Sequence, residues 1–149
     1  MPLLFKSDNP RVLFVTSGTS SLVETELTEG IIARINAAPD AGWPKSQQLN
    51  PVTSYRSTKT GLNMLMREWH RILRNDPVKV WAISPGFLAT GLGGVGAETL
   101  KKVGDCLPIG AQDPSVGGKF IKEVVEGKRD EHQGKIIRSG FFSDPVQPY

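Results

Sequence analysis

The sequence contains one cysteine, Cys106, so no disulfide can form within the chain. This excludes the small disulfide-stapled classes, fits a reducing compartment and leads us to expect a cytoplasmic protein. The 149 residues carry no internal repeat and no long block of like charges, which excludes coiled-coil, collagen-like and wholly disordered chains. What remains is a chain of ordinary length for one globular domain.

Clustered basic charge is missing as well. The 18 basic and 15 acidic residues give a net charge of +3, but lysine and arginine gather only in short pairs such as Lys101–Lys102 and Lys128–Arg129. Nucleic-acid-binding surfaces need a clustered basic stripe, so we expect no nucleic-acid partner. The uncharged stretch 80–97 contains Pro85 and five glycines, which would break a lipid-exposed helix. We therefore expect no membrane association.

Potential metal ligands are also sparse. His70 and His132 are far apart in the sequence and have no cysteine, glutamate or aspartate at ligand spacing, so we predict no metal site. We interpret His70 as a packing residue or a partner of the carboxyl end of its helix. Cys106 has no neighbouring group that would favour a thiolate, and we interpret it as a small buried or loop residue.

Apolar residues are present in two patterns that together predict an α/β fold. Short apolar, β-branched runs predict buried strands, and amphipathic stretches predict helices. In chain order the predicted elements are a strand at 11–16, a helix at 54–75, a strand at 78–84, a helix at 114–127 and a strand at 135–138. Such alternation indicates parallel strands joined by right-handed crossovers.

Each of the two predicted helices has an apolar face, a capping signal and a stop. Ser54 is the predicted N-cap of the first, and Pro114 lies in the first turn of the second. Spacings of three and four residues define the inward faces. The residues expected to face inward are Leu62, Met66, Trp69 and Leu73 in the first helix and Phe120, Val124 and Val125 in the second.

The segment 18–53 separates the first strand from the long helix. Ser21 and Glu24 have the spacing of a capping box, and Leu27, Ile31 and Ile35 follow at helical intervals. These signals predict one helix that ends before the turn at residues 39–42, followed by a loop through Trp43-Pro44.

Tyr55 and Lys59 form the strongest candidate for chemistry. Four residues apart, they share one face of the predicted helix. A phenol is mostly protonated at neutral pH, and a fixed ammonium nearby stabilises the phenolate, which makes the pair suited to proton transfer. The same pattern also arises by chance, and a helical tyrosine is often a core residue.

Other polar residues follow the predicted strands at their carboxyl ends, where an α/β sheet presents side chains to ligands. Ser17 comes directly after the first strand, Pro85-Gly86 ends the second, and Thr90 lies four residues beyond Gly86. Taken alone, Ser17 could be a turn serine and Thr90 a loop hydroxyl. In this order, together with Tyr55 and Lys59, they resemble the catalytic half of the short-chain dehydrogenase/reductase family.

The resemblance extends over residues 3–139 and includes the Pro114-Ser115 helix start and the Gly134-Lys135-Ile136-Ile137 strand. It implies hydride transfer between NAD or NADP and a carbonyl or alcohol carbon of a small molecule. Ser17 would bind the substrate oxygen, Tyr55 would act as acid or base, and Lys59 would stabilise the phenolate and hold the nicotinamide ribose. The implied catalytic residues are Ser17, Tyr55 and Lys59, and the implied cofactor-binding residues are Tyr55, Lys59, Pro85, Gly86, Leu88 and Thr90.

A glycine-rich run after these residues also matches a known cofactor-binding motif. Residues 91–96 match G-x-G-x-x-G, the dinucleotide fingerprint. That fingerprint requires a glycine run that directly follows a strand and opens a helix, whereas this run lies beyond Pro85-Gly86. We predict that it belongs to a loop over the substrate and not to a pyrophosphate site.

The sequence departs from the family pattern in two ways. The glycine-rich turn, the residue that selects NAD or NADP and the helical asparagine that precede the serine strand in the family are missing. The resemblance therefore implies one incomplete domain, 1–149, with a partial Rossmann-like doubly wound sheet of about three strands, truncated at the N-terminus. The second departure is the long spacer 18–53, which resembles the insertion of carbonyl-reductase-like members and favours a monomer for the parent fold.

The incomplete sheet leaves a second hypothesis open. Without a neighbour, the strand at 11–16 would be an exposed apolar edge through which the chain could associate. The alternative to an enzyme is therefore a non-catalytic fragment that acts as an interaction or complementation module.

Overall fold

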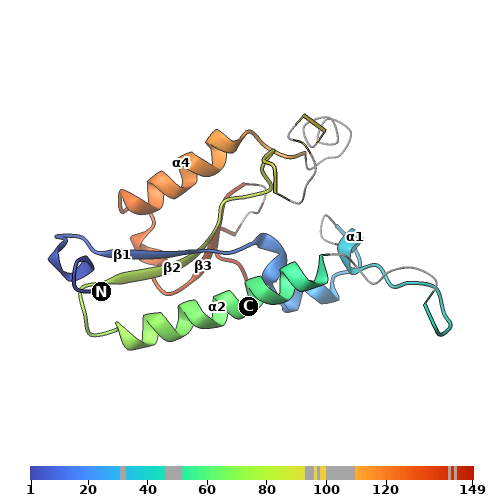
Figure 1. Cartoon of the computed structure of the whole chain (residues 1–149), viewed down its shortest axis with the longest axis horizontal. Coiled ribbons are helices and arrows are strands. Elements are labelled where there is room, and N and C mark those ends of the chain that lie inside the picture. Colours follow the sequence, from blue (N-terminus) through green and yellow to red (C-terminus); the bar gives the residue numbers. More distant parts are fainter. Residues whose placement is uncertain are drawn as a thin grey trace.

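The computed structural model describes residues 1–30, 33–45, 52–92, 96, 98–99, 110–140, 142 and 144–149. Figure 1 shows three strands side by side, with one long helix below them and a second helix above. The elements are η1 (Leu4–Lys6), β1 (Arg11–Val15), η2 (Gly18–Ser20), η3 (Val23–Glu26), α1 (Ala33–Asn36), α2 (Thr53–Ile72), β2 (Lys79–Ser84), α4 (Pro114–Val125), η4 (Asp130–His132) and β3 (Ile136–Arg138).

The strands form one open parallel sheet in the order β1-β2-β3. Val12 is paired with Val80, and Ala82 is paired with Ile136. All three strands lie within one residue of their predicted bounds, and the prediction of parallel strands with crossover helices is confirmed. β2 is therefore the central strand, and β1 and β3 are the edges of the described sheet.

Side chains of β2 alternate between two cores, one on each face of the sheet. Val80 and Ala82 pack in the core that contains Met66 of α2 and Leu73, which follows the last residue of that helix. On the opposite face, Trp81 and Ile83 pack with Phe120 and Val124 of α4. All eight of these side chains are buried, so β2 is covered on both faces as a central parallel strand requires.

Several details of the helices differ from the predictions, including the end of α4, which lies at Val125 and not at Gly127. Val125, the last residue of α4, is 52% exposed because Phe120 and Val124 take the positions that face the sheet. Ser54 is not the N-cap of α2: the helix begins at Thr53, and Val52 occupies the cap position without a side-chain hydrogen bond. α2 also ends three residues before the predicted stop, at Ile72.

The single helix predicted between residues 21 and 39 is wrong. The Ser21 hydroxyl does accept a hydrogen bond from the backbone N–H of Glu24 at 3.2 Å, but it starts only the short η3. Gly30 then adopts a φ of +83°, which an α-helix does not allow, and α1 covers only Ala33–Asn36. Leu27, predicted to face inward, is 45% exposed. Ile31, of the same predicted face, lies outside the described residues.

His70 packs against the turn before β3, as its interpretation as a packing residue predicts. A Cβ added to Gly134, which has a φ of +76°, would lie 2.5 Å from Nε2 of His70. The imidazole thus occupies the space that a side chain at residue 134 would need. Burial, with the neighbouring positive charges of Arg67, Arg74 and Lys135, lowers the pKa of His70.

A partly buried ion pair connects the edge strand β1 to η4. The Arg11 guanidinium donates to both carboxylate oxygens of Asp130, at 2.6 and 3.0 Å, and lies over the Trp81 ring, 5.2 Å from its centroid. Lys79 donates to the same carboxylate at 2.5 Å. These contacts join β1, β2 and η4 at the amino ends of the strands.

Within the described part of the chain, no helix combines the length and the apolar character needed to cross a bilayer. Cys106 and part of the glycine run 91–96 lie outside the described residues, and so do the loop predictions for them.

Candidate functional site

The candidate site lies at the carboxyl edge of the sheet, where β1 and β2 end next to each other. The backbone N–H of Thr16 donates to the Ile83 carbonyl at 2.8 Å. A Cβ placed on Gly18 would lie 3.5 Å from the Ser84 hydroxyl. The serine turn after β1 and the Pro85-Gly86 turn after β2 are therefore neighbours, as their positions after parallel strands predict.

Tyr55 and Lys59 lie one turn apart on α2, near the end of β1. The Lys59 ammonium is 5.7 Å from the centroid of the Tyr55 ring and donates to the Val15 carbonyl at 2.9 Å. Both side chains are half-buried. Lys59 thus connects the helix to the last residue of β1, with its charge beside the tyrosine.

Hydrogen bonds attach the serine turn to the same part of α2. Arg56 Nε donates to the Thr19 carbonyl at 3.0 Å, and the Thr60 hydroxyl donates to the Ser20 carbonyl at 2.8 Å. Within the turn, the Ser17 hydroxyl accepts from the backbone N–H of Thr19 at 3.2 Å. The structure therefore places the Ser17 turn against the first two turns of α2, which carry Tyr55 and Lys59.

Asn63, which the sequence reasoning missed, lies one turn beyond Lys59. Its amide oxygen accepts from the Thr16 hydroxyl at 2.6 Å, and its amide nitrogen donates to the Ser20 hydroxyl at 2.9 Å. Asn63 is 5% exposed and makes bonds on both sides of Ser17. The sequence contained a signal for it, because residues 55, 59 and 63 are spaced by four on one helix face.

The loop after β2 is held by the segment that leads into α4. The backbone N–H of Ala89 donates to the Gln112 carbonyl, and that of Gln112 donates to the Phe87 carbonyl, both at 2.8 Å. Gly86 has a φ of +102°, which favours glycine. The Thr90 hydroxyl accepts from the backbone N–H of Leu92 at 3.3 Å. Pro85, Gly86, Leu88 and Thr90 thus form one ordered turn.

Two buried polar atoms lie beside this turn without a hydrogen-bond partner in the described part of the chain. They are the amide oxygen of Gln112 and the hydroxyl of Ser139. A Cβ on Gly86 would lie 3.0 Å from the Ser139 hydroxyl and 3.4 Å from the Gln112 oxygen. Buried polar atoms normally have partners, so this pair is capable of binding a polar group that approaches the glycine.

Across the described residues, no group of three or more histidine, cysteine, aspartate or glutamate side chains is arranged to hold a metal ion. The arrangement combines a hydroxyl, a phenol and an ammonium with a tight glycine turn. Such a set can hold an oxygen atom and move a proton to or from it.

Comparison with known proteins finds two curated relatives of the chain. The chain is 44% identical over 151 residues to the short-chain dehydrogenase/reductase tropE of Talaromyces stipitatus, across 100% of this chain and 51% of that protein. It is 49% identical over 152 residues to the short-chain dehydrogenase/reductase eupG of a Phoma species, across 99% of this chain and 51% of that protein. The chain is homologous to the C-terminal half of short-chain dehydrogenases/reductases.

The resemblance inferred from the motifs is therefore confirmed, and the chain spans about half the length of the curated relatives it matches. No protein-family model matches the sequence. Among solved structures, the fold of this chain is similar to that of the Caenorhabditis elegans protein Sniffer, which is named as a carbonyl reductase. The match has a TM-score of 0.53 and 19% identity, and covers 99% of this chain and 47% of the other.

Proposed function

We propose that the chain forms the catalytic part of an NAD(P)-dependent short-chain dehydrogenase/reductase. On this proposal, residues 1–149 are one incomplete NAD(P)-binding domain, in which residues 18–53 are an insertion. The observation that carries the proposal is the attachment of the Ser17 turn to the helix that presents Tyr55 beside the Lys59 ammonium. The relatives named as short-chain dehydrogenases/reductases support the same reaction class.

The proposed reaction interconverts a small-molecule carbonyl and alcohol. A bound nicotinamide supplies or accepts the hydride. Ser17 donates a hydrogen bond to the substrate oxygen, and Tyr55 gives that oxygen a proton in the reductive direction or takes one in the oxidative direction. The Lys59 charge stabilises the phenolate that is left after proton donation.

The residues at the turn after β2 fit the nicotinamide end of NAD or NADP. Pro85, Gly86, Leu88 and Thr90 would hold that end through backbone groups and the Thr90 hydroxyl, while Tyr55 and Lys59 would hold the ribose. Two observations support the fit: the positive φ of Gly86, and the polar atoms of Gln112 and Ser139 beside it, which have no hydrogen-bond partner among the described residues. The preference between NAD and NADP stays open, because the residues that select it precede the serine strand in the family.

The closeness of Gly117 to the same turn gives a test of this assignment. A Cβ on Gly117 would lie 2.4 Å from Leu88 Cδ1 and 3.1 Å from the Pro85 carbonyl oxygen. The added methyl must displace Leu88 or the backbone of the turn, at a cost in stability of about 1–3 kcal/mol. Because the displaced turn no longer fits the cofactor, Gly117→Ala is expected to raise the cofactor Kd by about tenfold, which is about 1.4 kcal/mol of binding free energy. Titration of the purified variant with NADPH and NADH measures the change.

Gly118→Ala provides the matched control for this substitution. A Cβ at residue 118 meets nothing within 4 Å, and the residue lies on the exposed side of α4. The control is expected to keep the wild-type Kd and to gain about 0.5–1 kcal/mol of stability from the better helix former. Equal cofactor affinity in the two variants would contradict the role given to the turn.

The proposed function is tested by titrating the 149-residue chain with NADPH and NADH, followed by turnover with a panel of small ketones and aldehydes. We expect saturable binding of one or both cofactors, and NADPH or NADH consumption that requires the carbonyl compound. Binding of neither cofactor, in a chain whose circular dichroism shows it to be folded, would refute the proposal.

The exposure of β1 favours one alternative function, in which the chain is an interaction module and not an enzyme. This strand is an edge of the described sheet, its residues are apolar after Arg11, and Val15 is 48% exposed. In the alternative function, the chain binds no nicotinamide and associates with a partner chain through this edge. Nicotinamide titration combined with sedimentation velocity separates the two functions, because the enzyme hypothesis predicts cofactor binding and the alternative predicts association without it.

A further inference from the structure

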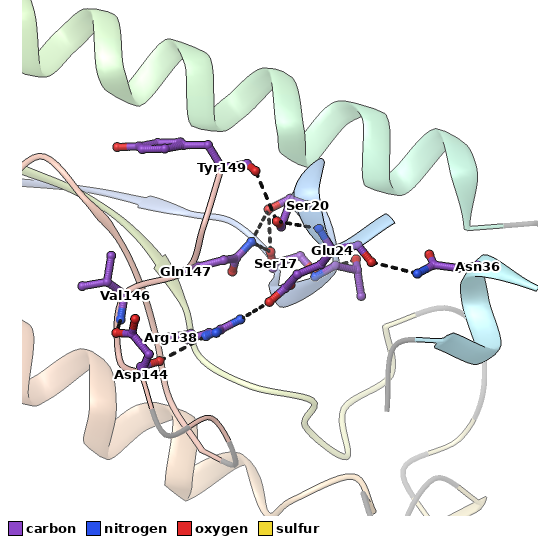
Figure 2. Close-up of polar contacts among 11 residues, drawn as sticks. Ser17, Ser20, Glu24, Asn36, Arg138, Asp144, Val146, Gln147 and Tyr149 are labelled. Carbon is purple, nitrogen blue, oxygen red and sulfur yellow. Dashed lines mark hydrogen bonds and ion pairs between the residues drawn. The ribbon is translucent and has the colours of Figure 1, made fainter. Parts of the chain in front are cut away.

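The C-terminal segment does not extend away from the sheet but returns along β3 toward the serine turn. The backbone N–H of Gln147 donates to the Ile136 carbonyl, and that of Arg138 donates to the Pro145 carbonyl, both at 2.9 Å. Ile137 and Val146 form an antiparallel bridge. Figure 2 shows the Gln147 side chain directed from this segment toward Ser17 and Ser20.

Gln147 contacts the backbone of the candidate catalytic serine directly. Its side-chain nitrogen donates to the Ser17 carbonyl at 3.3 Å and to the Ser20 hydroxyl at 3.2 Å. The Ser20 hydroxyl donates to the same Ser17 carbonyl at 2.6 Å. Gln147 and Ser20 are 1% and 2% exposed, so water does not compete for these bonds. Together with the backbone N–H of Ser20, which donates to the same carbonyl at 3.2 Å, these two side-chain donors fix the peptide plane that follows Ser17.

A second contact secures the segment that follows the turn. Arg138 of β3 donates to the Glu24 carboxylate at 2.7 Å, and the two side chains are 8% and 10% exposed. This ion pair joins η3 to the strand that Gln147 lies beside, as Figure 2 shows. The serine turn is thus held on the side opposite to α2 by residues more than 110 positions away in the sequence.

The unpartnered oxygen of Gln147 argues against a purely structural role. The buried Oε1 has no hydrogen-bond partner in the described part of the chain. Leaving a buried acceptor unpaired costs about 1–3 kcal/mol, which offsets the stability that the two donated hydrogen bonds contribute, so an apolar side chain of the same length is expected to serve stability about equally well. What the amide adds is donation to the Ser17 carbonyl.

We propose that Gln147 is a positioning residue that sets the orientation of Ser17 toward the substrate oxygen. The proposal rests on the proposed function for the role of Ser17, but not for the contact itself. Because the Ser17 carbonyl is fixed by the Gln147 amide and the Ser20 hydroxyl, the serine side chain has a defined direction before substrate binds. Substrate binding then does not have to order the turn.

The test compares wild type with Gln147→Met, which keeps the length and burial of the side chain but cannot donate. Hydrogen exchange is measured at the amides of Thr19 and Ser20, with the amides of α2 as internal reference. The variant is expected to exchange at least tenfold faster in the turn, with α2 unchanged and the melting temperature equal or higher. Its kcat is expected to fall at least tenfold at an unchanged cofactor Kd.

Pro148→Ala is the matched control, because the neighbouring proline is exposed. It should leave turn exchange, kcat and Kd at wild-type values. Ser20→Ala is the second variant: it removes the other side-chain donor to the Ser17 carbonyl and is expected to accelerate exchange in the same turn, even if Gln147→Met fails to fold.

Several results would overturn the proposal. Unchanged turn exchange in Gln147→Met, acceleration that spreads equally through α2, or a lowered melting temperature with full kcat would each show a merely structural role. The proposed function fails separately, if the wild-type chain reduces no carbonyl compound. In that case, the exchange comparison still decides whether Gln147 orders the serine turn.

Discussion

Tyr55→Phe is expected to lower kcat for carbonyl reduction by about 10²–10⁴-fold, the usual contribution of a positioned general acid. Phenylalanine keeps the ring, its half-buried position on α2 and its contact with the Lys59 ammonium, which lies 5.7 Å from the ring centroid. Only the hydroxyl that donates the proton is lost. The cofactor Kd is therefore expected to change by less than about tenfold, or 1.4 kcal/mol.

Steady-state turnover at saturating cofactor, with Kd measured by titration, checks this expectation. The chain offers a matched control in its other tyrosine, Tyr149, which is 48% exposed and whose hydroxyl donates only a long 3.4 Å bond to the Gly134 carbonyl. Tyr149→Phe should keep wild-type kcat. A Tyr55→Phe variant with more than a tenth of wild-type turnover would remove Tyr55 from the proposed proton transfer.

Asp130→Ala is expected to lower the free energy of unfolding by about 2 kcal/mol at neutral pH. The Arg11 guanidinium hydrogen-bonds the Asp130 carboxylate and, together with Lys79, lowers the pKa of that carboxyl from 3.8 to about 2 in spite of its partial burial. Removing the carboxylate leaves the Arg11 side chain, which is 7% exposed, without its ionic partner. Urea denaturation of both proteins measures the difference.

The same difference should depend on pH in a defined direction. Because the pKa of Asp130 is lower in the folded state, its stabilisation is complete above about pH 5 and is lost as the pH falls from 3.8 toward 2. The unfolding curves of wild type and Asp130→Ala should therefore converge in acid. Glu131→Ala is the control: its side chain is 61% exposed and pairs only with His132 at 3.3 Å, so a change below about 0.5 kcal/mol is expected. A pH-independent gap between wild type and Asp130→Ala would contradict the ionic explanation.

The elements that could be predicted from the sequence are those whose signals are local and agree with their packing. Residues 80–83 are an apolar run between Pro77 and Pro85, and they are buried in the strand that they form. The helix expected at 21–39 failed because its periodicity was interrupted by Gly30, whose positive φ ends any helical path. Local pattern cannot show which of two competing signals the tertiary structure selects.

Some residues of the candidate site could likewise be predicted from the sequence, and others could not. Ser17, Tyr55 and the Pro85-Gly86 turn could be placed at one sheet edge, because parallel strands bring their carboxyl ends together. Gln147 and the Glu24–Arg138 pair could not be predicted, because they depend on the chain turning back after β3. The sequence around Gln147 contains no periodicity, charge pattern or motif that indicates a partner 130 residues away.

The parallel sheet also has a consequence for how the molecule folds. Every pair of residues aligned across it, from Arg11 with Lys79 to Ser84 with Arg138, joins positions more than 50 residues apart. No part of the sheet can form before a long loop has closed, so the entropy of closure precedes any gain from strand pairing. The helices can form early, but β2 has no partner until one of the distant strands arrives. The rate of folding is therefore expected to depend on how quickly β1 or β3 meets β2, and during that interval the strand that becomes buried on both faces is exposed.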